Sequence, residues 1–299
     1  MPNPENSKAA AGWRNPGMSL AFGSALAYTC YDVGVRALIG DLTVWGLLFL
    51  RGAIGVTVVG VLARIFSRPL WGQRKRALAL VGLCGFLSSV ANATSLSTIP
   101  LYQALMIIYL YPVFTLLLAV PINGEPVARS DLGLMSLAIG GGLALIWPDE
   151  AVGLAFTINH LVGVIGAVFY SLGQVLIRRM GTGNSGLEPI FHYSLYALIF
   201  SLPLALLFGR ELGIDSARGL ASGLALAGMG MTAQLAGFAA LRWIPGFKVG
   251  LIGYLELALG AFISWLVFSD PMSPRALAGG VLVVLTAFQL RRTGGGASH

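Results

Sequence analysis

Residues 99–126 read IPLYQALMIIYLYPVFTLLLAVPINGEP, and residues 244–271 read IPGFKVGLIGYLELALGAFISWLVFSDP. The two stretches lie 145 positions apart and match at their starts, in their middles and at their ends. The matching pairs are Ile99-Pro100 with Ile244-Pro245, Tyr109-Leu110 with Tyr254-Leu255, and Glu125-Pro126 with Asp270-Pro271. Each stretch is a long apolar run that closes on an acidic residue and a proline. The chain therefore repeats itself.

The composition around these stretches indicates a membrane protein. Of 299 residues, 56% are hydrophobic and 10% are charged, whereas a soluble domain has about 25% charged residues. So few charges cannot cover a surface exposed to water. The 40 glycines agree with this interpretation, because small residues let helices approach one another closely in lipid.

A helix needs about 20 apolar residues to cross the hydrocarbon core of a bilayer, and ten such segments follow one another. The predicted spans are Met18–Ile39, Leu42–Ala63, Ala77–Thr98, Leu101–Ile122, Leu132–Trp147, Leu161–Ile177, Pro189–Phe208, Leu220–Leu241, Gly246–Phe268 and Ala276–Leu290. We therefore predict an all-α integral membrane protein of ten transmembrane helices. Residues 1–17 are an N-terminal segment, 18–148 a first five-helix repeat, 159–292 a second repeat and 293–299 a C-terminal tail.

The basic residues predict the orientation of these spans. The sequence has 19 lysines and arginines, and 14 of them fall in segments on the side of the N-terminus. Four fall on the other side, namely Arg36, Arg210, Arg218 and Arg275, and Arg51 lies inside a span. Lysine and arginine are enriched in cytoplasmic loops. Both termini are therefore predicted to be cytoplasmic, in a bacterial-type inner membrane.

The odd number of helices in each repeat predicts that the two halves are inverted. A chain that crosses the membrane five times enters its second repeat from the opposite face. At a shift of 142 residues, Tyr28 aligns with Tyr170, Asp32 with Gln174 and Arg36 with Arg178. Inverted repeats place a binding site near the bilayer midplane and provide two related conformations for alternating access.

These residues carry a family resemblance over roughly residues 18 to 293. The sequence resembles the EamA family of the drug/metabolite transporter superfamily in four features. These are the two repeats, Arg51, the Tyr109-Leu-Tyr-Pro112 stretch that ends at Glu125-Pro126, and Tyr254-Leu-Glu256 with Asp270-Pro271. The stretch before Pro112 is similar to the YddG type of aromatic amino acid exporters. The resemblance implies transport of small metabolites, with amino acids and export as its most specific implication. The chain departs from it at Leu257, where many relatives carry proline.

Glu256 is the first candidate for the substrate site. It lies about ten residues into its predicted span, near the bilayer centre, where an ionised carboxylate is costly unless it is paired or protonated. It can be a proton site, an anchor for a substrate amino group, or a hydrogen-bonded brace between helices. For Arg51, which is also inside a span, local pairing and a structural role are favoured.

Four tyrosines lie near the midplane, away from the interfaces that tyrosine favours. They are Tyr109, Tyr111, Tyr170 and Tyr254. By the repeat, Tyr109 corresponds to Tyr254 and Tyr111 to Glu256, so each pair is expected to face a shared central space. An aromatic cavity suits amphipathic or aromatic substrates. The alternative is interhelical packing, with each hydroxyl bonded to a backbone carbonyl.

Neutral polar groups complete the candidate set. Ser88 and Asn92 are one helical turn apart, as are Gln234 and Phe238. They are expected either to bind substrate or to bridge helices. Pro112 cannot donate a backbone hydrogen bond, so it is expected to kink its helix beside the cavity by freeing the carbonyl of Ile108.

Motifs of enzymes are missing from the sequence, which contains no HExxH, P-loop or GxSxG pattern. We therefore expect no catalytic residues, no cofactor and no metal, and as partners a small-molecule substrate and the lipid bilayer, without nucleic acid or an obligatory second subunit. The predicted function is a secondary transporter or facilitator of amino acids that works as an exporter. Transport of nucleotide sugars or other metabolites is the alternative within the superfamily, and a channel is the alternative outside it.

Overall fold

The computed structural model describes residues 15–37, 43–72, 74–99, 104, 107–125, 127–146, 157–181, 186–207, 212, 214, 216–268 and 273–293. All regular structure in these ranges is helical, as the sequence predicts. The ten helices are α2 (Pro16–Ala37), α3 (Val44–Ile65), α4 (Lys75–Thr98), α6 (Tyr111–Asn123), α7 (Arg129–Ile146), α8 (Ile158–Met180), α9 (Leu187–Leu207), α10 (Ala217–Ala240), α11 (Gly246–Phe268) and α12 (Pro274–Thr293). The pair Asp270-Pro271, most of the N-terminal segment and most of the C-terminal tail lie outside the described residues.

Several helices have the length and composition of membrane spans. In the described part of the chain, α3, α8, α9, α10 and α11 contain apolar stretches long enough to cross a bilayer, and α6 and α12 contain shorter ones. Large apolar side chains such as Leu206 and Leu266 are exposed on the helix surfaces. Such surfaces are unfavourable in water and favourable in lipid.

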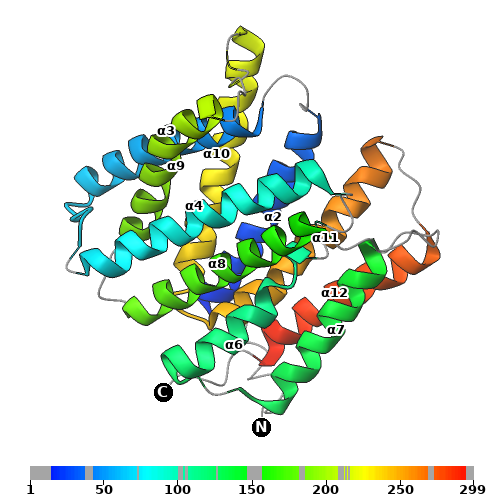
Figure 1. The fold of residues 1–299 in the computed structure, drawn as a ribbon. Coiled ribbons are helices and arrows are strands. Elements are labelled where there is room, and N and C mark those ends of the chain that lie inside the picture. The colour runs from blue at the N-terminus through cyan, green and yellow to red at the C-terminus, as the bar shows by residue number, and fades with distance from the viewer. Residues whose placement is uncertain are drawn as a thin grey trace.

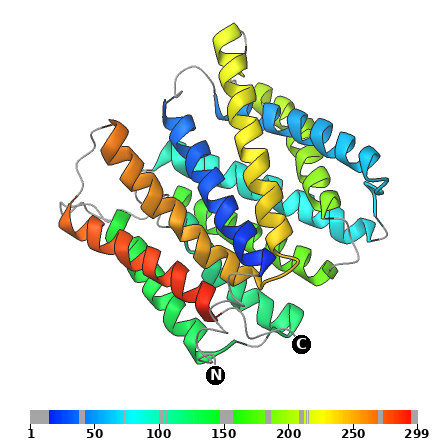
Figure 2. The ribbon, with the colours of Figure 1, turned by 180° about the vertical axis from the view of Figure 1, so that it is seen from behind.

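The helices pack in pairs that correspond between the two halves (Figures 1 and 2). Helix α2 packs against α10 as α8 packs against α4, and α2 packs against α11 as α8 packs against α6. Helix α3 packs against its own counterpart α9 at one edge of the bundle, and α7 packs against its counterpart α12 at the other. This arrangement leaves α2, α6, α8 and α11 around the centre, where the two halves meet.

The fourth predicted span is the one that differs most from the structure. Within Leu101–Ile122, the described residues Ala104, Ile107 and Ile108 are helical, a turn follows at Tyr109 and Leu110, and α6 begins at Tyr111. Pro112 lies in the first turn of α6, a position where its missing N–H would be unpaired in any case. The helical path is therefore interrupted by a turn next to Pro112, and the role of Pro112 in a kink or in gating stays a prediction.

The corresponding helix of the second half has no such interruption. Pro112 corresponds to Leu257 at the 145-residue shift, and α11 runs from Gly246 to Phe268 without a break at Leu257. Leucine donates its backbone N–H and favours the helical conformation. One residue difference between the repeats thus accounts for a continuous α11 and an interrupted counterpart.

Candidate functional site

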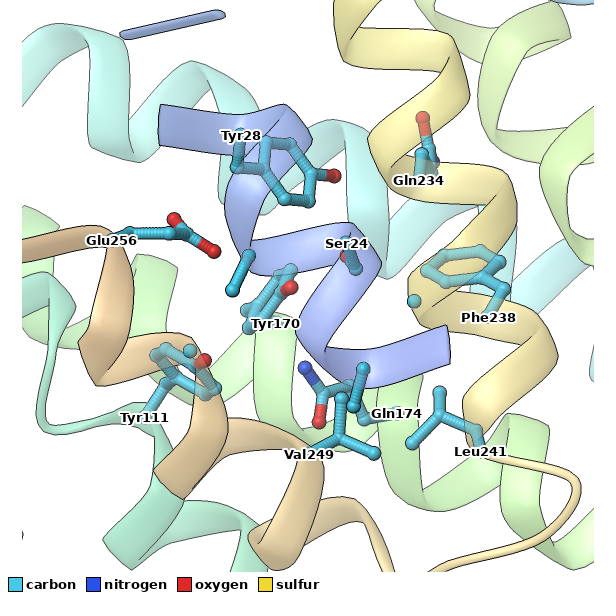
Figure 3. Close-up of a pocket in the computed structure, with 14 residues that line it drawn as sticks. Ser24, Tyr28, Tyr111, Tyr170, Gln174, Gln234, Phe238, Leu241, Val249 and Glu256 are labelled. Carbon is cyan, nitrogen blue, oxygen red and sulfur yellow. The ribbon is translucent and has the colours of Figure 1, made fainter. Parts of the chain in front are cut away.

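A cavity lies in the centre of the bundle, between α2, α6, α8, α10 and α11 (Figure 3). Its polar lining comes from all five helices and consists of Ser24, Tyr28, Tyr111, Tyr170, Gln174, Gln234 and Glu256. Phe238, Leu241 and Val249 add apolar surface. The volume of about 30 Å³ is enough for a water molecule or two.

Five of the nine residues predicted to bind substrate line this cavity. They are Tyr111, Tyr170, Gln234, Phe238 and Glu256, which the fold brings together from α6, α8, α10 and α11. The other four, Tyr109, Tyr254, Ser88 and Asn92, do not belong to its lining. The distance in sequence between the five residues shows that only the assembled bundle creates this site.

Glu256 extends from α11 toward α2, between Tyr28 and Tyr170 (Figure 3). Its Oε2 accepts a hydrogen bond from the hydroxyl of Tyr109 at 3.3 Å. Among the described residues, no basic side chain forms an ion pair with this carboxylate. The cavity therefore contains an acidic group that lacks a cationic partner, in surroundings of phenol rings and amides.

The hydroxyls of the other candidate tyrosines mainly join helices. Tyr254 donates to the backbone oxygen of Tyr109, and Tyr111 donates to the backbone oxygen of Gly250 at 3.2 Å. The ring of Tyr111 meets that of Tyr170 edge to face, with ring centres 4.9 Å apart. The hydroxyls of Tyr111 and Tyr254 thus bond to backbone oxygens, as the packing alternative predicts. The hydroxyl of Tyr109 instead bonds to the carboxylate of Glu256, and Tyr111 also lines the cavity.

Ser88 and Asn92 lie where α4 packs against α8. The Nδ2 of Asn92 donates to the Oγ of Ser88 at 3.5 Å. A Cβ atom at Gly166 of α8 would lie 2.7 Å from the Oδ1 of Asn92, so only glycine lets the two helices approach this closely. The hydrogen bond of this pair lies within α4, and the Oδ1 of Asn92 is buried without a hydrogen-bond partner among the described residues. The two predicted roles of the pair, substrate binding and helix bridging, therefore stay predictions.

Sequence reasoning missed three lining residues, namely Ser24, Tyr28 and Gln174. Ser24 donates to the backbone oxygen of Ala233 at 2.8 Å and ties α2 to α10. The Oε1 atoms of Gln174 and Gln234 are buried without a hydrogen-bond partner among the described residues. The alignment at a shift of 142, which pairs Tyr28 with Tyr170 and Asp32 with Gln174, was the signal that could have found Tyr28 and Gln174.

Polar contacts close the end of the bundle predicted to face the cytoplasm. Arg178 of α8 forms an ion pair with Glu125 at 3.6 Å and donates to the backbone oxygen of Leu241 at 3.1 Å. Lys248 of α11 lies 3.5 Å from Asp131 of α7. These contacts involve three separate parts of the chain, namely residues 125–131, Arg178 and residues 241–248. Leu241 is nearly fully buried.

No group of three or more histidine, cysteine, aspartate or glutamate side chains that could hold a metal ion occurs in the described ranges.

Comparison with known proteins identifies the family. The profile of the EamA-like transporter family matches residues 15–147 and, a second time, residues 157–291. The pseudopaline exporter CntI of Pseudomonas aeruginosa is 25% identical over 285 residues, which cover 93% of this chain and 96% of the exporter. A solved structure known only as "Crystal structure of protein" has the same fold, with a TM-score of 0.77 at 18% identity over 91% of this chain and 94% of that one. Because the two profile matches together cover most of its length, this protein belongs to the EamA-like transporter family.

Proposed function

We propose that this transporter exports small organic metabolites that carry an amino group, amino acids first among them, through the central cavity. The observation that carries the proposal is the Glu256 carboxylate, which faces an aromatic cavity and has no ion-pair partner among the described residues. A substrate ammonium would supply the missing charge, and the phenol rings would supply apolar contact and cation–π attraction. The likeness to an exporter supports the direction.

We derive the topology of the chain and the route of the substrate from the correspondence between the two halves. Ten spans, an inverted second repeat and cytoplasmic termini remain our proposal for the topology, supported by two family matches in tandem and by corresponding helix pairs. In this scheme the contacts of Arg178 and Lys248 close the inner end, and export requires a second conformation in which they are broken. Alternating opening of the two ends would carry the substrate outward.

Within this proposal, Tyr111, Tyr170, Gln234, Phe238 and Glu256 contact the substrate, together with Tyr28 and Gln174. Tyr109 and Tyr254 hold the first group in place through their hydrogen bonds. Ser88 and Asn92 act at the α4–α8 contact. Export of pseudopaline or a related metabolite is the second candidate function, favoured by the 25% identical relative.

Transport by the pure protein tests the proposal directly. Liposomes loaded with one unlabelled amino acid are incubated with a trace of the same labelled amino acid, across a panel, with and without a pH gradient. We expect accumulation of label for at least one neutral or aromatic member of the panel. Protein-free liposomes are the control. Accumulation of pseudopaline or of a nucleotide sugar, with no response to any amino acid, would reject the amino acid assignment.

Cysteine labelling tests the predicted orientation. Cys30 and Cys84 are the native cysteines, both unpaired, and are first replaced by serine. Single cysteines at Lys75 and Thr293 are expected to be shielded from an impermeant thiol reagent in intact cells, and one at Arg218 is expected to react. The reason is the bias of basic residues toward the cytoplasmic side. Reaction at Lys75 or Thr293 in unbroken cells would overturn the orientation.

A further inference from the structure

A second polar cluster lies next to the cavity and is formed by Arg51 of α3 with Tyr31 and Asp32 of α2. The guanidinium carbon of Arg51 lies 5.0 Å from the centre of the Tyr31 ring. The Nη1 of Arg51 donates to the Tyr31 hydroxyl at 3.3 Å. Arg51 is half-buried and two turns into α3, so its charge lies within the helix bundle.

The hydrogen-bonding capacity of Arg51 is mostly unused. A guanidinium carries five N–H donors, and the Tyr31 hydroxyl accepts from one of them. The Nε of Arg51 is buried and has no partner among the described residues. Asp32 interacts with Arg51 electrostatically, but its side chain is exposed and the two form no ion pair in the described structure. A cation held this way is costly unless an anion joins it during the working cycle.

The Nε edge of Arg51 is closely packed against α10. The residue of α10 that faces Arg51 is Gly230, where a Cβ atom would lie 3.3 Å from the Nε of Arg51 and 3.2 Å from the Tyr31 ring. An anion can therefore reach this edge of the guanidinium only when α3 and α10 move apart. The planar edge of a guanidinium fits the two oxygens of a carboxylate.

The cluster is connected to the cavity through one aromatic side chain. The ring of Tyr31 packs edge to face against Tyr28, with ring centres 6.4 Å apart and planes at 82°. Tyr28 in turn lines the cavity with Glu256 (Figure 3). The hydroxyl of Tyr28 lies within electrostatic range of both Arg51 and Glu256. The cation of Arg51 on α3 and the anion of Glu256 on α11 thus both lie within electrostatic range of the Tyr28 phenol, and neither forms an ion pair among the described residues.

We propose that Arg51 binds the carboxylate of the substrate while Glu256 binds its ammonium group, so that the preferred substrates are zwitterions. This inference rests on the proposed function, which explains how the ammonium group is bound, and it adds a binding site for the carboxylate of the same substrate. The sequence favoured a structural role for Arg51, which predicts a local partner for each of its donors. The buried Nε without a partner is what separates the two roles. Asp32 competes with the substrate carboxylate for Arg51.

The test compares phenylalanine with phenylalaninamide, which keeps the ring and the ammonium but lacks the carboxylate. Exchange in liposomes is measured for the wild type, Arg51→Gln, Arg51→Lys and the control Arg64→Gln, which removes an exposed arginine at the end of the same helix. We expect Arg51→Gln to raise the half-saturating concentration of phenylalanine about tenfold or more and to leave the amide nearly unchanged. Arg51→Lys should show an intermediate preference, and Arg64→Gln should behave like the wild type. Asp32→Asn should increase the preference for the acid over the amide.

A second measurement does not depend on transport. The melting temperature of each purified variant is recorded with phenylalanine, phenylalaninamide or 3-phenylpropionate, which has the carboxylate without the amine. Both carboxylates should stabilise the wild type more than Arg51→Gln. Arg51 would be structural if Arg51→Gln lost the same affinity for phenylalanine as for phenylalaninamide. It would also be structural if the two carboxylates raised the melting temperatures of the wild type and of Arg51→Gln equally. If the wild type exchanges no member of the amino acid panel but is still stabilised by the two carboxylates, the amino acid function fails and the anion site stands. If none of the three stabilises it, the anion site fails as well.

Discussion

Replacing Glu256 with glutamine is expected to weaken the binding of amino acids about tenfold to hundredfold. Hydrogen bonds to charged groups contribute about 1.5–3 kcal/mol, and about 1.4 kcal/mol corresponds to a tenfold change in binding. Glutamine keeps the size of glutamate and still accepts from the Tyr109 hydroxyl, but it offers no charge to an ammonium group. The half-saturating concentration for exchange in liposomes measures the effect.

The same variant distinguishes the three roles that the sequence leaves open for Glu256. If glutamate binds the substrate ammonium, glutamine impairs both exchange and accumulation driven by a pH gradient. If it carries a coupling proton, accumulation is lost and exchange remains. If it is a brace, both activities survive. We expect the first result, because Glu256 lines the cavity while its counterpart in the repeat is Tyr111, whose phenol does not release a proton near neutral pH.

A matched control separates this effect from the general cost of changing a buried acid. Glu188, in the first turn of α9, is also buried but does not line the cavity. Glu188→Gln is expected to keep the substrate affinity of the folded protein. If Glu256→Gln kept the substrate affinity and the accumulation of the wild type, the proposed role of Glu256 would be rejected.

Replacing Gly55 with valine is expected to disrupt the contact between α3 and α9. A Cβ atom at Gly55 would collide with the Oγ of Ser194 and lie 2.6 Å from the Cε of Met231. Both neighbours are buried, so they have little space to move. Overpacking of this kind costs about 1–3 kcal/mol, occasionally more. We expect a lower yield of monodisperse protein in detergent and a lower melting temperature.

Gly60 provides the control in the same helix. No atom lies within 4 Å of the Cβ position at Gly60, so valine there has the same helix propensity as valine at position 55 without the collision. Gly60→Val is expected to melt close to the wild type. Equal melting temperatures for the two variants would contradict the observed packing of α3 on α9.

The candidate site could be predicted only in part, and the reason differs among residues. Glu256 was found because a carboxylate in an apolar span is conspicuous in sequence. Ser88 and Asn92 were chosen by the same reasoning, yet they lie at the α4–α8 contact, since a helical spacing defines a face but not the neighbour of that face. Gln174 was passed over although its buried Oε1 faces the cavity region.

The sequence by itself determined the helical class, most helix bounds and the correspondence between the halves. Each of these depends on local properties, because an apolar run of sufficient length must form a helix in lipid wherever its neighbours lie. Only the tertiary structure decided that a turn at Tyr109 and Leu110 precedes α6, that Tyr254 bonds to the backbone of Tyr109, and that the Nε of Arg51 is buried without a partner among the described residues. Those facts depend on the rotation of each helix about its axis and on its approach to its neighbours. Both are set by the packing of side chains that are distant in sequence, so no local pattern contains them.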